Sequence, residues 1–333
     1  MIKIGIIGYG YWGPNIARNF NACENAKLVS ICDLDEKRLK LAKSTYPFIE
    51  EFKDPLDLIK SDEIDAVAVI TPVYTHYELA KSALEHGKHI FVEKPFTSKV
   101  SQGEELIEMA EKKDLKIMVD HTFLFTGAVQ KMREIVNSGE LGDLFFYDSV
   151  RVNLGLFRHD VNVIWDLAPH DFSIMNYLID EKPTAITATG SEHFGRNLED
   201  IAYVTVHFNN NFIAHFHCNW LSPVKVRKTL ISGSKKMLIW DDISPDEKVK
   251  IYDKGVDVDI KNIHELLVSY RSGDVRIPRV ENTEALKLEA EYFAECVEKN
   301  WKPFNDGEAG LEVVRMLQAS DESLKKDGKK IRL

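Results

Sequence analysis

Short apolar runs alternate with helical patterns through the first third of the chain, and this alternation restricts the fold more than any other feature. Between the runs, apolar residues recur at helical spacing, as at Leu39 and Ala42 and again at Leu106 and Ala110. The runs are almost continuously apolar, as expected of parallel strands buried on both faces: Ile4–Ile7, Leu28–Cys32, Ala66–Ile70, His89–Val92 and Lys116–Val119. Strand–helix–strand repetition predicts a doubly wound parallel sheet that ends near His121.

The remainder of the chain predicts a second domain of a different kind. Turn signals at Asn209-Asn210-Asn211 and Gly233-Ser234 separate strand-like runs, which favours a mostly antiparallel sheet. The runs are Phe145–Val152, Ile186–Gly190, Ile201–Phe208, Phe212–Trp220, Lys228–Ser232 and Met237–Trp240. Two amphipathic helices close the chain, the second after a cap at Asp306. We therefore predict an α/β protein with a parallel domain over 1–121 and an α+β domain over 122–333, whose closing helix packs back toward the first.

Charge and cysteine content limit the partners. The 333 residues carry 43 Lys and Arg against 53 Asp and Glu, a net charge of −10, so nucleic acid is not an expected partner. The four cysteines are scattered, which fits reduced thiols better than disulfides or a zinc site. The opening run Met1–Ile7 is too short for a signal peptide, and no segment has the roughly 20 apolar residues of a membrane helix. These features predict a soluble cytoplasmic protein with no metal and no membrane partner.

A glycine-rich turn follows the first apolar run. Gly8-Tyr9-Gly10-Tyr11-Trp12-Gly13 fits G-x-G-x-x-G, whose glycines allow a tight turn, approach of the backbone to a pyrophosphate and close helix–strand packing. The helix that begins there offers unpaired N–H groups and its positive dipole end to phosphates. A turn without a ligand has the same local pattern. If a dinucleotide binds, we expect contacts from Gly8, Gly10, Tyr11, Trp12 and Gly13, although the aromatic rings could equally pack within the protein.

Asp33 strengthens the dinucleotide interpretation. It ends the second strand twenty residues after Gly13, where a carboxylate can accept hydrogen bonds from both ribose hydroxyls. Leu34 and Asp35 follow, so a 2′-phosphate would meet two carboxylates, which favours NAD over NADP. Arg38 is the nearby cation that could reverse this preference. Asp33 could also cap the next helix.

The third and fourth strands end in polar residues. Thr71-Pro72 ends the third, with His76 five residues later, and Glu93-Lys94-Pro95 ends the fourth. Ligands of open α/β sheets bind outside the carboxyl ends of strands, so we expect Thr71, Pro72, His76, Glu93 and Lys94 beside the cofactor. The Lys94 ammonium could stabilise negative charge on a substrate oxygen as a hydride leaves or arrives. A solvated surface lysine is the alternative.

Asp166 and His170 form a second candidate group. Four residues apart on a helix, they share a face, and a carboxylate that orients an imidazole is a common arrangement for a general base. Pro169 is tolerated if the helix starts near Asp166, which would make Asp166 partly a cap. A cap with a satisfied histidine is the structural alternative.

Other polar residues give weaker signals. His121, Arg151, Asn153 and Arg158 are candidate substrate contacts, although solvated positions are the base expectation. His215 and His217 share one strand face, where a sheet-surface or interface role is favoured over half a metal site.

Taken together, the glycine turn, Thr71-Pro72 with His76, Glu93-Lys94-Pro95, and Asp166 with His170 resemble the glucose–fructose oxidoreductase/inositol dehydrogenase/rhizopine catabolism (Gfo/Idh/MocA) family. The resemblance implies a Rossmann domain and a domain with a large open sheet that is often used for dimer or tetramer contacts. It also implies that Lys94 binds the reacting oxygen, that His170 is the acid/base with Asp166 as its partner, and that the Lys94-Pro95 peptide is cis.

Some segments depart from the family pattern. Val73 stands where the family often has Asn, so an amide contact to the cofactor is absent. The segment Asp120–Phe125 differs from the Asn-Arg-Arg pattern of many sugar-acting members. It looks more like the branch of nucleotide-sugar dehydrogenases in polysaccharide biosynthesis, a likeness that Arg151–Gly155 and Ser232–Met237 support.

The resemblance leads to a specific hypothesis. We expect an NAD-dependent oxidoreductase that transfers a hydride between nicotinamide and a sugar ring carbinol, the 3-position of a UDP-linked acetamido sugar. Oxidation of a free cyclitol, aldose or dihydrodiol is one alternative, and operation as an NADPH-dependent reductase is another. A non-catalytic dinucleotide-binding sensor is the alternative from another class.

Overall fold

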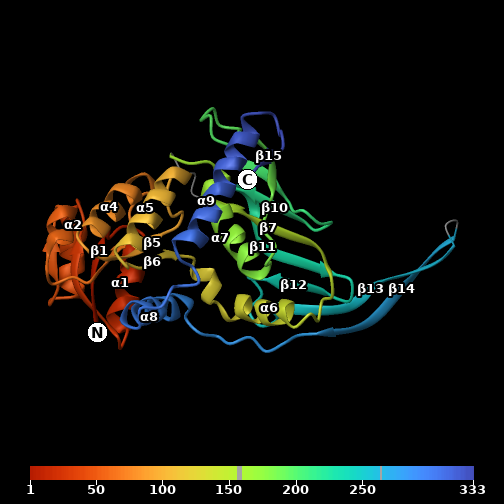
Figure 1. The fold of residues 1–333 in the computed structure, drawn as a ribbon, viewed down its shortest axis with the longest axis horizontal. Helices are drawn as coiled ribbons and strands as arrows, with labels where there is room; N and C mark the ends of the chain where they lie inside the picture. Colours follow the sequence, from red (N-terminus) through yellow and green to blue (C-terminus); the bar gives the residue numbers. More distant parts are fainter. Residues whose placement is uncertain (156–159, 263–264) are drawn as a thin grey trace. The chain divides into compact units, whose positions relative to one another are not determined.

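The computed structural model describes residues 1–155, 160–262 and 265–333 (Figure 1). The chain divides into two compact units. The first comprises Met1–Phe125 and Thr283–Arg315, and the second comprises Thr126–Asn282 and Met316–Leu333. The first unit thus includes a late segment that the sequence analysis assigns to the second domain.

The first unit is built on a parallel sheet of six described strands in the order β3-β2-β1-β4-β5-β6. The strands are β1 (Ile2–Ile7), β2 (Ala26–Cys32), β3 (Glu50–Phe52), β4 (Ala66–Val69), β5 (His89–Glu93) and β6 (Ile117–Asp120). The helices are α1 (Gly13–Ala22), α2 (Glu36–Thr45), α3 (Pro55–Lys60), α4 (Val73–Glu85), α5 (Val100–Lys112), the 3₁₀ turn η1 (Thr122–Phe125), α8 (Ala285–Glu298) and the first part of α9 (Gly307–Leu324). The predicted doubly wound sheet is confirmed. The sequence analysis missed β3, a short, polar edge strand that exists through its pairing with β2.

The second unit is built on a sheet of nine described strands in the order β14-β13-β12-β11-β7-β10-β9-β8-β15. Apart from the parallel pair β7 and β10, the described neighbours are antiparallel, as expected. The strands are β7 (Leu144–Leu154), β8 (Ala185–Ser191), β9 (Ile201–His207), β10 (Ile213–Asn219), β11 (Leu221–Gly233), β12 (Met237–Asp241), β13 (Val249–Asn262), β14 (Glu265–Arg276) and β15 (Ile331–Arg332). Its helices are α6 (Gly127–Asn137), α7 (Val163–Leu178) and the last part of α9.

The two faces of this sheet differ. Side chains such as Tyr147, Val204 and Phe216 are fully buried on the face that α7 covers. On the opposite face the alternate residues are partly buried or exposed. We call this the outer sheet face and define it by Phe146, Asp148, Val150, Tyr203, Ile213, His215, His217, Leu230, Met237 and Ile239.

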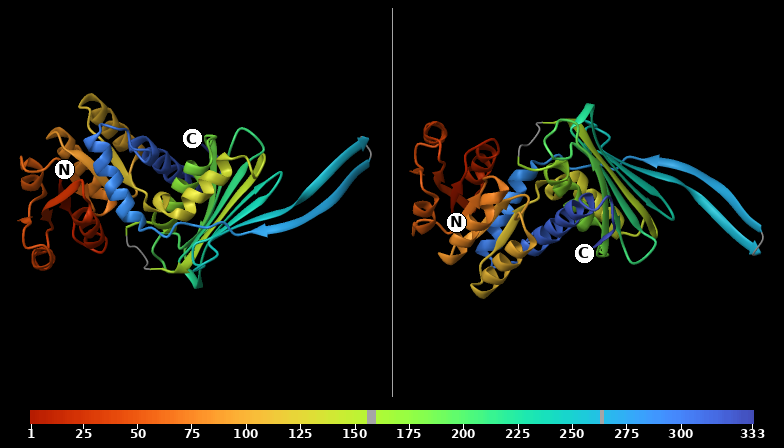
Figure 2. Two further views of the ribbon diagram at one scale, coloured as in Figure 1. Left: turned by 90° about the horizontal axis from the view of Figure 1, so that it is seen from below. Right: turned by 90° about the horizontal axis from the view of Figure 1, so that it is seen from above.

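A long hairpin extends the sheet beyond its neighbours. After Tyr252, β13 no longer pairs with β12 and continues with β14 alone, so the two strands project as a ribbon (Figures 1 and 2). The sequence analysis missed it, although Val256, Val258 and Ile260 alternate with polar residues as in a strand.

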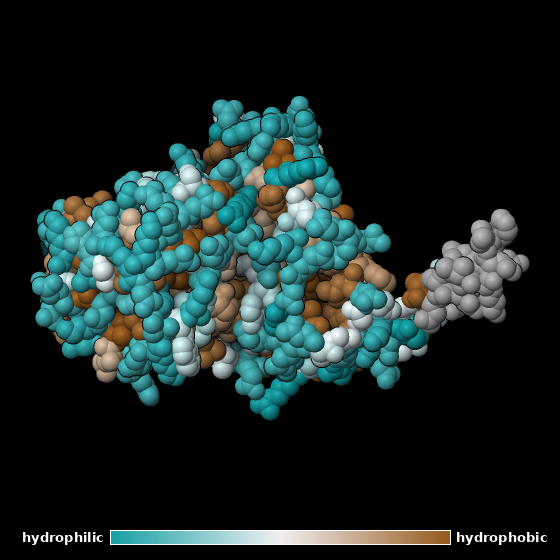
Figure 3. Space-filling view, viewed as in Figure 1, coloured by the Kyte–Doolittle hydropathy of each residue, from teal (hydrophilic) through white to brown (hydrophobic). Residues whose placement is uncertain are grey.

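Several local predictions are tested directly. The predicted cap at Asp306 is confirmed, since its Oδ1 accepts from the N–H of Ala309 at 2.9 Å. The cap of α2 is Asp35, which accepts from the N–H of Lys37 at 2.8 Å, so a capping role for Asp33 is wrong. The four cysteines are free and buried. Hydrophilic side chains cover most of the surface drawn in Figure 3, and no described helix has the length and apolar character to cross a membrane.

Candidate functional site

The glycine turn connects β1 to α1 with the backbone that a dinucleotide requires. Gly8 has a φ of +100°, and a Cβ there would lie 2.2 Å from the carbonyl oxygen of Ile70. A Cβ on Gly13 would lie 2.4 Å from the carbonyl oxygen of Gly8, so both positions need glycine. A Cβ on Gly10 would meet only the Arg38 guanidinium, at 3.5 Å, which leaves its backbone open to a ligand. The N-cap residue of α1, Trp12, makes no side-chain capping bond. Pro14 has no N–H, and the Asn15 N–H donates to the Trp12 carbonyl at 3.0 Å, so the start of α1 offers a phosphate its positive dipole end but fewer N–H groups than predicted.

The aromatic residues of the turn lie in different surroundings. Tyr9 is buried, whereas Tyr11 is 89% exposed and stacks on Trp12 with ring centroids 6.3 Å apart. The Trp12 indole N–H points to Asp120 Oδ2 at 3.4 Å. Trp12 therefore connects the glycine turn to the end of β6, a contact that sequence spacing could not reveal.

Asp33 lies at the end of β2 and is 8% exposed. Its Oδ2 accepts from the N–H of Tyr9 at 2.7 Å, so the carboxylate holds the glycine turn. Arg38 Nη1 lies 3.6 Å from Asp33 Oδ2, and its Nε lies 3.9 Å from Asp35. With two carboxylates around this one arginine, the site fits the ribose hydroxyls of NAD better than a 2′-phosphate.

The ends of β4 and β5 meet through His76. This side chain on α4 is 1% exposed, and its Nε2 and Nδ1 lie 2.7 and 3.0 Å from the carbonyl oxygens of Thr71 and Pro95. Burial lowers the pKa of His76, whereas the surrounding carbonyl groups act in the opposite direction. The Lys94-Pro95 peptide is cis, as the resemblance implies, and Lys94 directly follows β5.

An acidic cluster lies beside Lys94. Glu93 ends β5, Asp120 ends β6, and Glu289 comes from α8, where it is fully buried. Burial, followed by the charge of Asp120, raises the pKa of both Glu93 and Glu289 well above the ordinary value. Glu289 Oε1 accepts from the amide of Asn305 at 3.2 Å. The sequence analysis missed Glu289. The one signal in the sequence is its place among apolar residues of a helix, next to Leu288 and Ala290.

His121 follows Asp120 and is 1% exposed. No described residue forms a hydrogen bond with either of its ring nitrogens. Burial lowers its pKa to about 4; the charge of Lys94 acts in the same direction and that of Asp120 opposes it. The imidazole is therefore neutral at physiological pH.

In the second unit, α7 begins earlier than predicted. Asn162 caps it by accepting from the N–H of Trp165 at 3.2 Å, so Asp166 lies in the first turn and Pro169 lies inside the helix. Asp166 Oδ2 accepts from the indole N–H of Trp220 at 3.0 Å. Trp220 lies between β10 and β11. It is a partner of Asp166 that the sequence analysis did not predict. His170 is partly exposed. Its role as the acid/base stays a prediction.

Arg151 is positioned by the core of its unit. It is 3% exposed, and its Nε and Nη2 each donate to Asp171 at 2.8 Å. This bidentate pair joins β7 to α7 next to His170 and favours a structural role over the substrate contact considered above. Asn153 donates to the carbonyl of Leu154 at 3.2 Å. Arg158 lies outside the described residues.

The paired histidines of β10 lie on the outer sheet face. The Tyr203 ring stacks on His217 and His215 at 4.4 and 5.9 Å between centroids. Within the described part of the chain, no group of three His, Cys, Asp or Glu residues is arranged to hold a metal ion.

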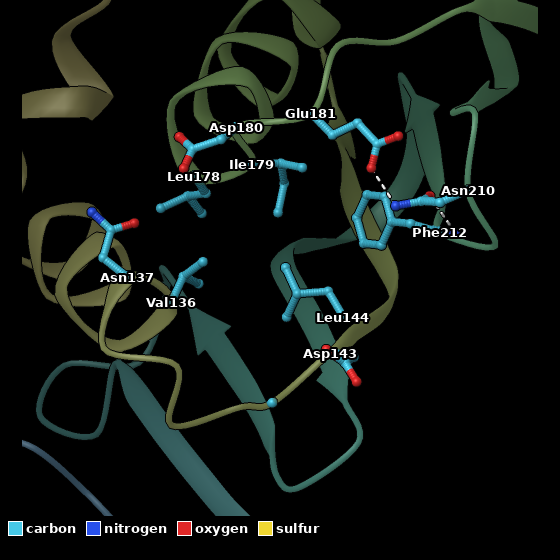
Figure 4. Close-up of a pocket in the computed structure, with 11 residues that line it drawn as sticks. Val136, Asn137, Asp143, Leu144, Leu178, Ile179, Asp180, Glu181, Asn210 and Phe212 are labelled. Atoms are coloured by element: carbon cyan, nitrogen blue, oxygen red, sulfur yellow. Dashed lines mark hydrogen bonds between the residues drawn. The ribbon is translucent and has the colours of Figure 1, made fainter.

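A surface pocket of about 540 Å³ lies at the start of β7 and the end of α7. Leu144, Leu178 and Phe212 line it, and Glu181 points toward Asn210 at its rim (Figure 4). None of the predicted site residues lines this pocket.

Two family models match the chain. Residues 2–121 match the oxidoreductase family with an NAD-binding Rossmann fold, and residues 129–239 match the GFO/IDH/MocA C-terminal domain. The myo-inositol 2-dehydrogenase of Thermotoga maritima is 29% identical over 63% of this chain and 66% of its own length, so the alignment spans about two thirds of that protein. The scyllo-inositol 2-dehydrogenase (NAD(+)) of Bacillus subtilis is 24% identical over 91% of this chain and 88% of its own.

Solved structures share the fold. The UDP-N-acetylglucosamine 3-dehydrogenase GnnA of Acidithiobacillus ferrooxidans has a TM-score of 0.84 at 22% identity and covers 98% of this chain and 99% of its own. The scyllo-inositol dehydrogenase of Lactobacillus casei with NAD(H) and scyllo-inositol has a TM-score of 0.81 at 20% identity, over 100% and 99%. From its two matched domains, the chain belongs to the GFO/IDH/MocA family of oxidoreductases, and its first unit is an NAD-binding Rossmann domain.

Proposed function

We propose that this protein is an NAD-dependent dehydrogenase of a sugar ring hydroxyl, with the 3-hydroxyl of a UDP-linked acetamido sugar as the substrate. The observation that carries the proposal is the position of Lys94. It follows β5 at the same sheet edge at which the glycine turn follows β1, so a cation stands where ligands of such sheets bind.

When bound, NAD supplies the hydride acceptor. Lys94 donates a hydrogen bond to the substrate oxygen and stabilises the negative charge that develops there. His170 takes the hydroxyl proton, and Asp166 supports the imidazolium that forms. Asp33 binds the adenosine ribose, and the backbone of the glycine turn, with the positive dipole end of α1, binds the pyrophosphate. The proposal requires Lys94 and His170 to act on one substrate molecule.

The substrate class rests on two supports. The segment Asp120–Phe125 departs from the Asn-Arg-Arg pattern of many sugar-acting members, and it places the neutral His121 after β6. The likeness in fold to GnnA, a UDP-N-acetylglucosamine 3-dehydrogenase, agrees with a nucleotide-sugar substrate. The proposed place in polysaccharide biosynthesis rests on the sequence resemblance of Asp120–Phe125 to that branch.

A free cyclitol is the second candidate, because two inositol dehydrogenases are among the relatives. The remaining candidate is a sensor that binds dinucleotide without catalysis. A panel of UDP-linked sugars, free aldoses and cyclitols, read by NADH absorbance, separates the three. Turnover of UDP-linked acetamido sugars supports the proposal, turnover of cyclitols alone replaces the substrate, and tight NADH binding without turnover favours the sensor.

The assignment of catalytic roles has its own test. In His170→Asn we expect turnover to fall by about 10²–10⁴-fold, because a general base of this kind contributes that factor. Lys94→Met should also abolish most turnover while the dissociation constant of NADH stays near wild type. Near wild-type turnover in either variant contradicts the role of that residue, and exposed His86→Gln serves as the matched control.

We also propose that copies of the chain associate as a homodimer or homotetramer through the outer sheet face. Stacked Tyr203 and His217 and the 43% exposed Ile213 leave partly apolar surface there, as expected of an interface. A cytoplasmic location, predicted from the reduced cysteines, agrees with a nucleotide-sugar substrate.

A further inference from the structure

Glu289 brings a carboxyl group into the interior of the first unit. It lies on α8, which packs against α1 and η1, and it is fully buried. Its Oε1 accepts from the side-chain amide of Asn305 at 3.2 Å, and the same amide nitrogen donates to the carbonyl oxygen of Val119 at 2.8 Å. Its Oε2 is closed to water and accepts from no donor among the residues that the structure describes. One oxygen of this carboxyl group is therefore buried without a donor.

The polar side chains close to Glu289 do not supply that donor. They are the carboxyl groups of Asp120 and Glu93 and the hydroxyl group of Thr122. Asp120 takes the hydrogens at hand. Its Oδ1 accepts from the N–H of Thr122 at 3.3 Å and from the Thr122 hydroxyl, and its Oδ2 lies 3.4 Å from the indole nitrogen of Trp12. A hydroxyl group has a single hydrogen, so Thr122 has none left for Glu289.

The cations of the neighbouring elements are engaged elsewhere. Arg18 of α1 pairs with Glu284, which precedes α8, and Lys3 of β1 forms its ion pair at the surface. Lys94 acts on the carboxyl group that ends β5, and the η1 turn has no charged side chain. The charged groups that an ionised Glu289 would face are therefore carboxylates, and a buried charge in such surroundings is costly.

A hydrogen on Oε2 would satisfy the buried oxygen and turn a contact between two carboxylates into a hydrogen bond. We propose that the folded protein holds Glu289 as a neutral carboxylic acid, whose hydrogen on Oε2 bonds the carboxylate of Asp120. Burial, followed by the charge of Asp120, raises the pKa of Glu289 well above the ordinary value, which agrees with this protonation. In this way α8 closes on the end of β6 without adding a negative charge beside Lys94. That benefit rests on the proposed function, in which Lys94 stabilises negative charge, whereas the protonation itself does not.

Glu289→Gln reproduces the proposed acid without its titration. The amide oxygen can accept from Asn305, the amide nitrogen can donate to Asp120, and the amide keeps its hydrogens at every pH. Above pH 4.5, the ordinary pKa of a glutamic acid, unfolding of the wild type releases the Glu289 proton, because the folded protein holds it and the unfolded chain does not. The contribution of Glu289 to the stability of the wild type therefore falls as the pH rises from 4.5 toward the raised pKa.

The quantity to measure is the unfolding equilibrium constant of the wild type divided by that of Glu289→Gln, from urea unfolding curves. One proton changes such a constant by about tenfold per pH unit, so the ratio should rise by about 100-fold between pH 5.5 and pH 7.5. Protons bound or released by other groups, such as His121, cancel in the ratio. Glu298→Gln, at an exposed position of the same helix, is the matched control and should give a ratio that is constant with pH. A constant ratio for Glu289→Gln overturns the proposal.

Infrared spectra test the same proton in proteins that retain Glu289. A protonated carboxylic acid has a carbonyl band that ionised carboxylates lack, and ordinary Asp and Glu side chains are ionised at pH 7.5. The band should be present at that pH in the wild type and in Glu93→Gln, which removes the other carboxyl group that could hold the proton. Its absence from either protein overturns the proposal. If the wild type oxidises no sugar, the proposed function fails, and both measurements, made without substrate, still decide the protonation of Glu289.

Discussion

Burial changes the ionisation of His121. An ordinary histidine has a pKa near 6.5, and burial in the first unit lowers that of His121 to about 4. Between pH 6.5 and pH 4 the imidazole is therefore protonated in the unfolded chain but neutral in the folded protein. The contribution of His121 to the free energy of unfolding is fully present above pH 6.5 and is lost as the pH falls toward 4.

We expect this residue to make the protein acid-sensitive. Between pH 7.5 and pH 4.5 its contribution to the free energy of unfolding should fall by about 3 kcal/mol, at about 1.4 kcal/mol per pH unit. His121→Phe, which cannot be protonated, should lose this part of the acid sensitivity in urea unfolding curves, whereas exposed His86→Gln should retain it. The same acid sensitivity in His121→Phe as in wild type would contradict the assignment.

At the scale of elements, the Arg151–Asp171 pair determines how α7 sits on β7. Both side chains are nearly inaccessible, at 3% and 2% exposure, and two bonds of 2.8 Å join them. Removing one member leaves the other as a buried, unpaired charge. Because His170 precedes Asp171 on the same helix, the pair also supports the proposed base.

Arg151→Met should therefore be strongly destabilising. We expect a loss of about 3–5 kcal/mol in the free energy of unfolding, and we expect Arg151→Met with Asp171→Leu to recover much of it, since no charge is then left unpaired. The matched control is Lys326→Met, whose exposed pair with Glu322 should be worth less than about 1 kcal/mol. A double variant no more stable than Arg151→Met would show that the pair itself is required.

At the scale of the whole molecule, association through the outer sheet face makes a prediction for solution behaviour. Ile213→Asp places a charge on this face and should convert an oligomer to monomers in light scattering after size exclusion, without a change in secondary structure. The control is Leu34→Asp, at an 85% exposed position in the first unit, which should leave the oligomer intact. A wild-type monomer, or an oligomer unaffected by Ile213→Asp, rules this interface out.

Features that depend on residues close together in the sequence were predicted correctly. The glycine turn, the strand ends at Asp33 and Lys94, and the cap at Asp306 were predictable because each depends on neighbours within a few residues. The start of α7 was misplaced, because the proline inside it looked like a first-turn residue.

The order of apolar runs and turns along the chain by itself determined the alternating parallel sheet and the glycine turn at its edge, because buried strands need continuous apolar runs and tight turns need glycine. Only the tertiary structure decided which polar groups meet inside each unit. Glu289 comes from α8 and lies close to Asp120 at the end of β6. The Trp220 indole donates to Asp166, and the Arg151 guanidinium donates to Asp171. A buried charge is satisfied by whatever group the packing brings to it, and no local pattern records that partner.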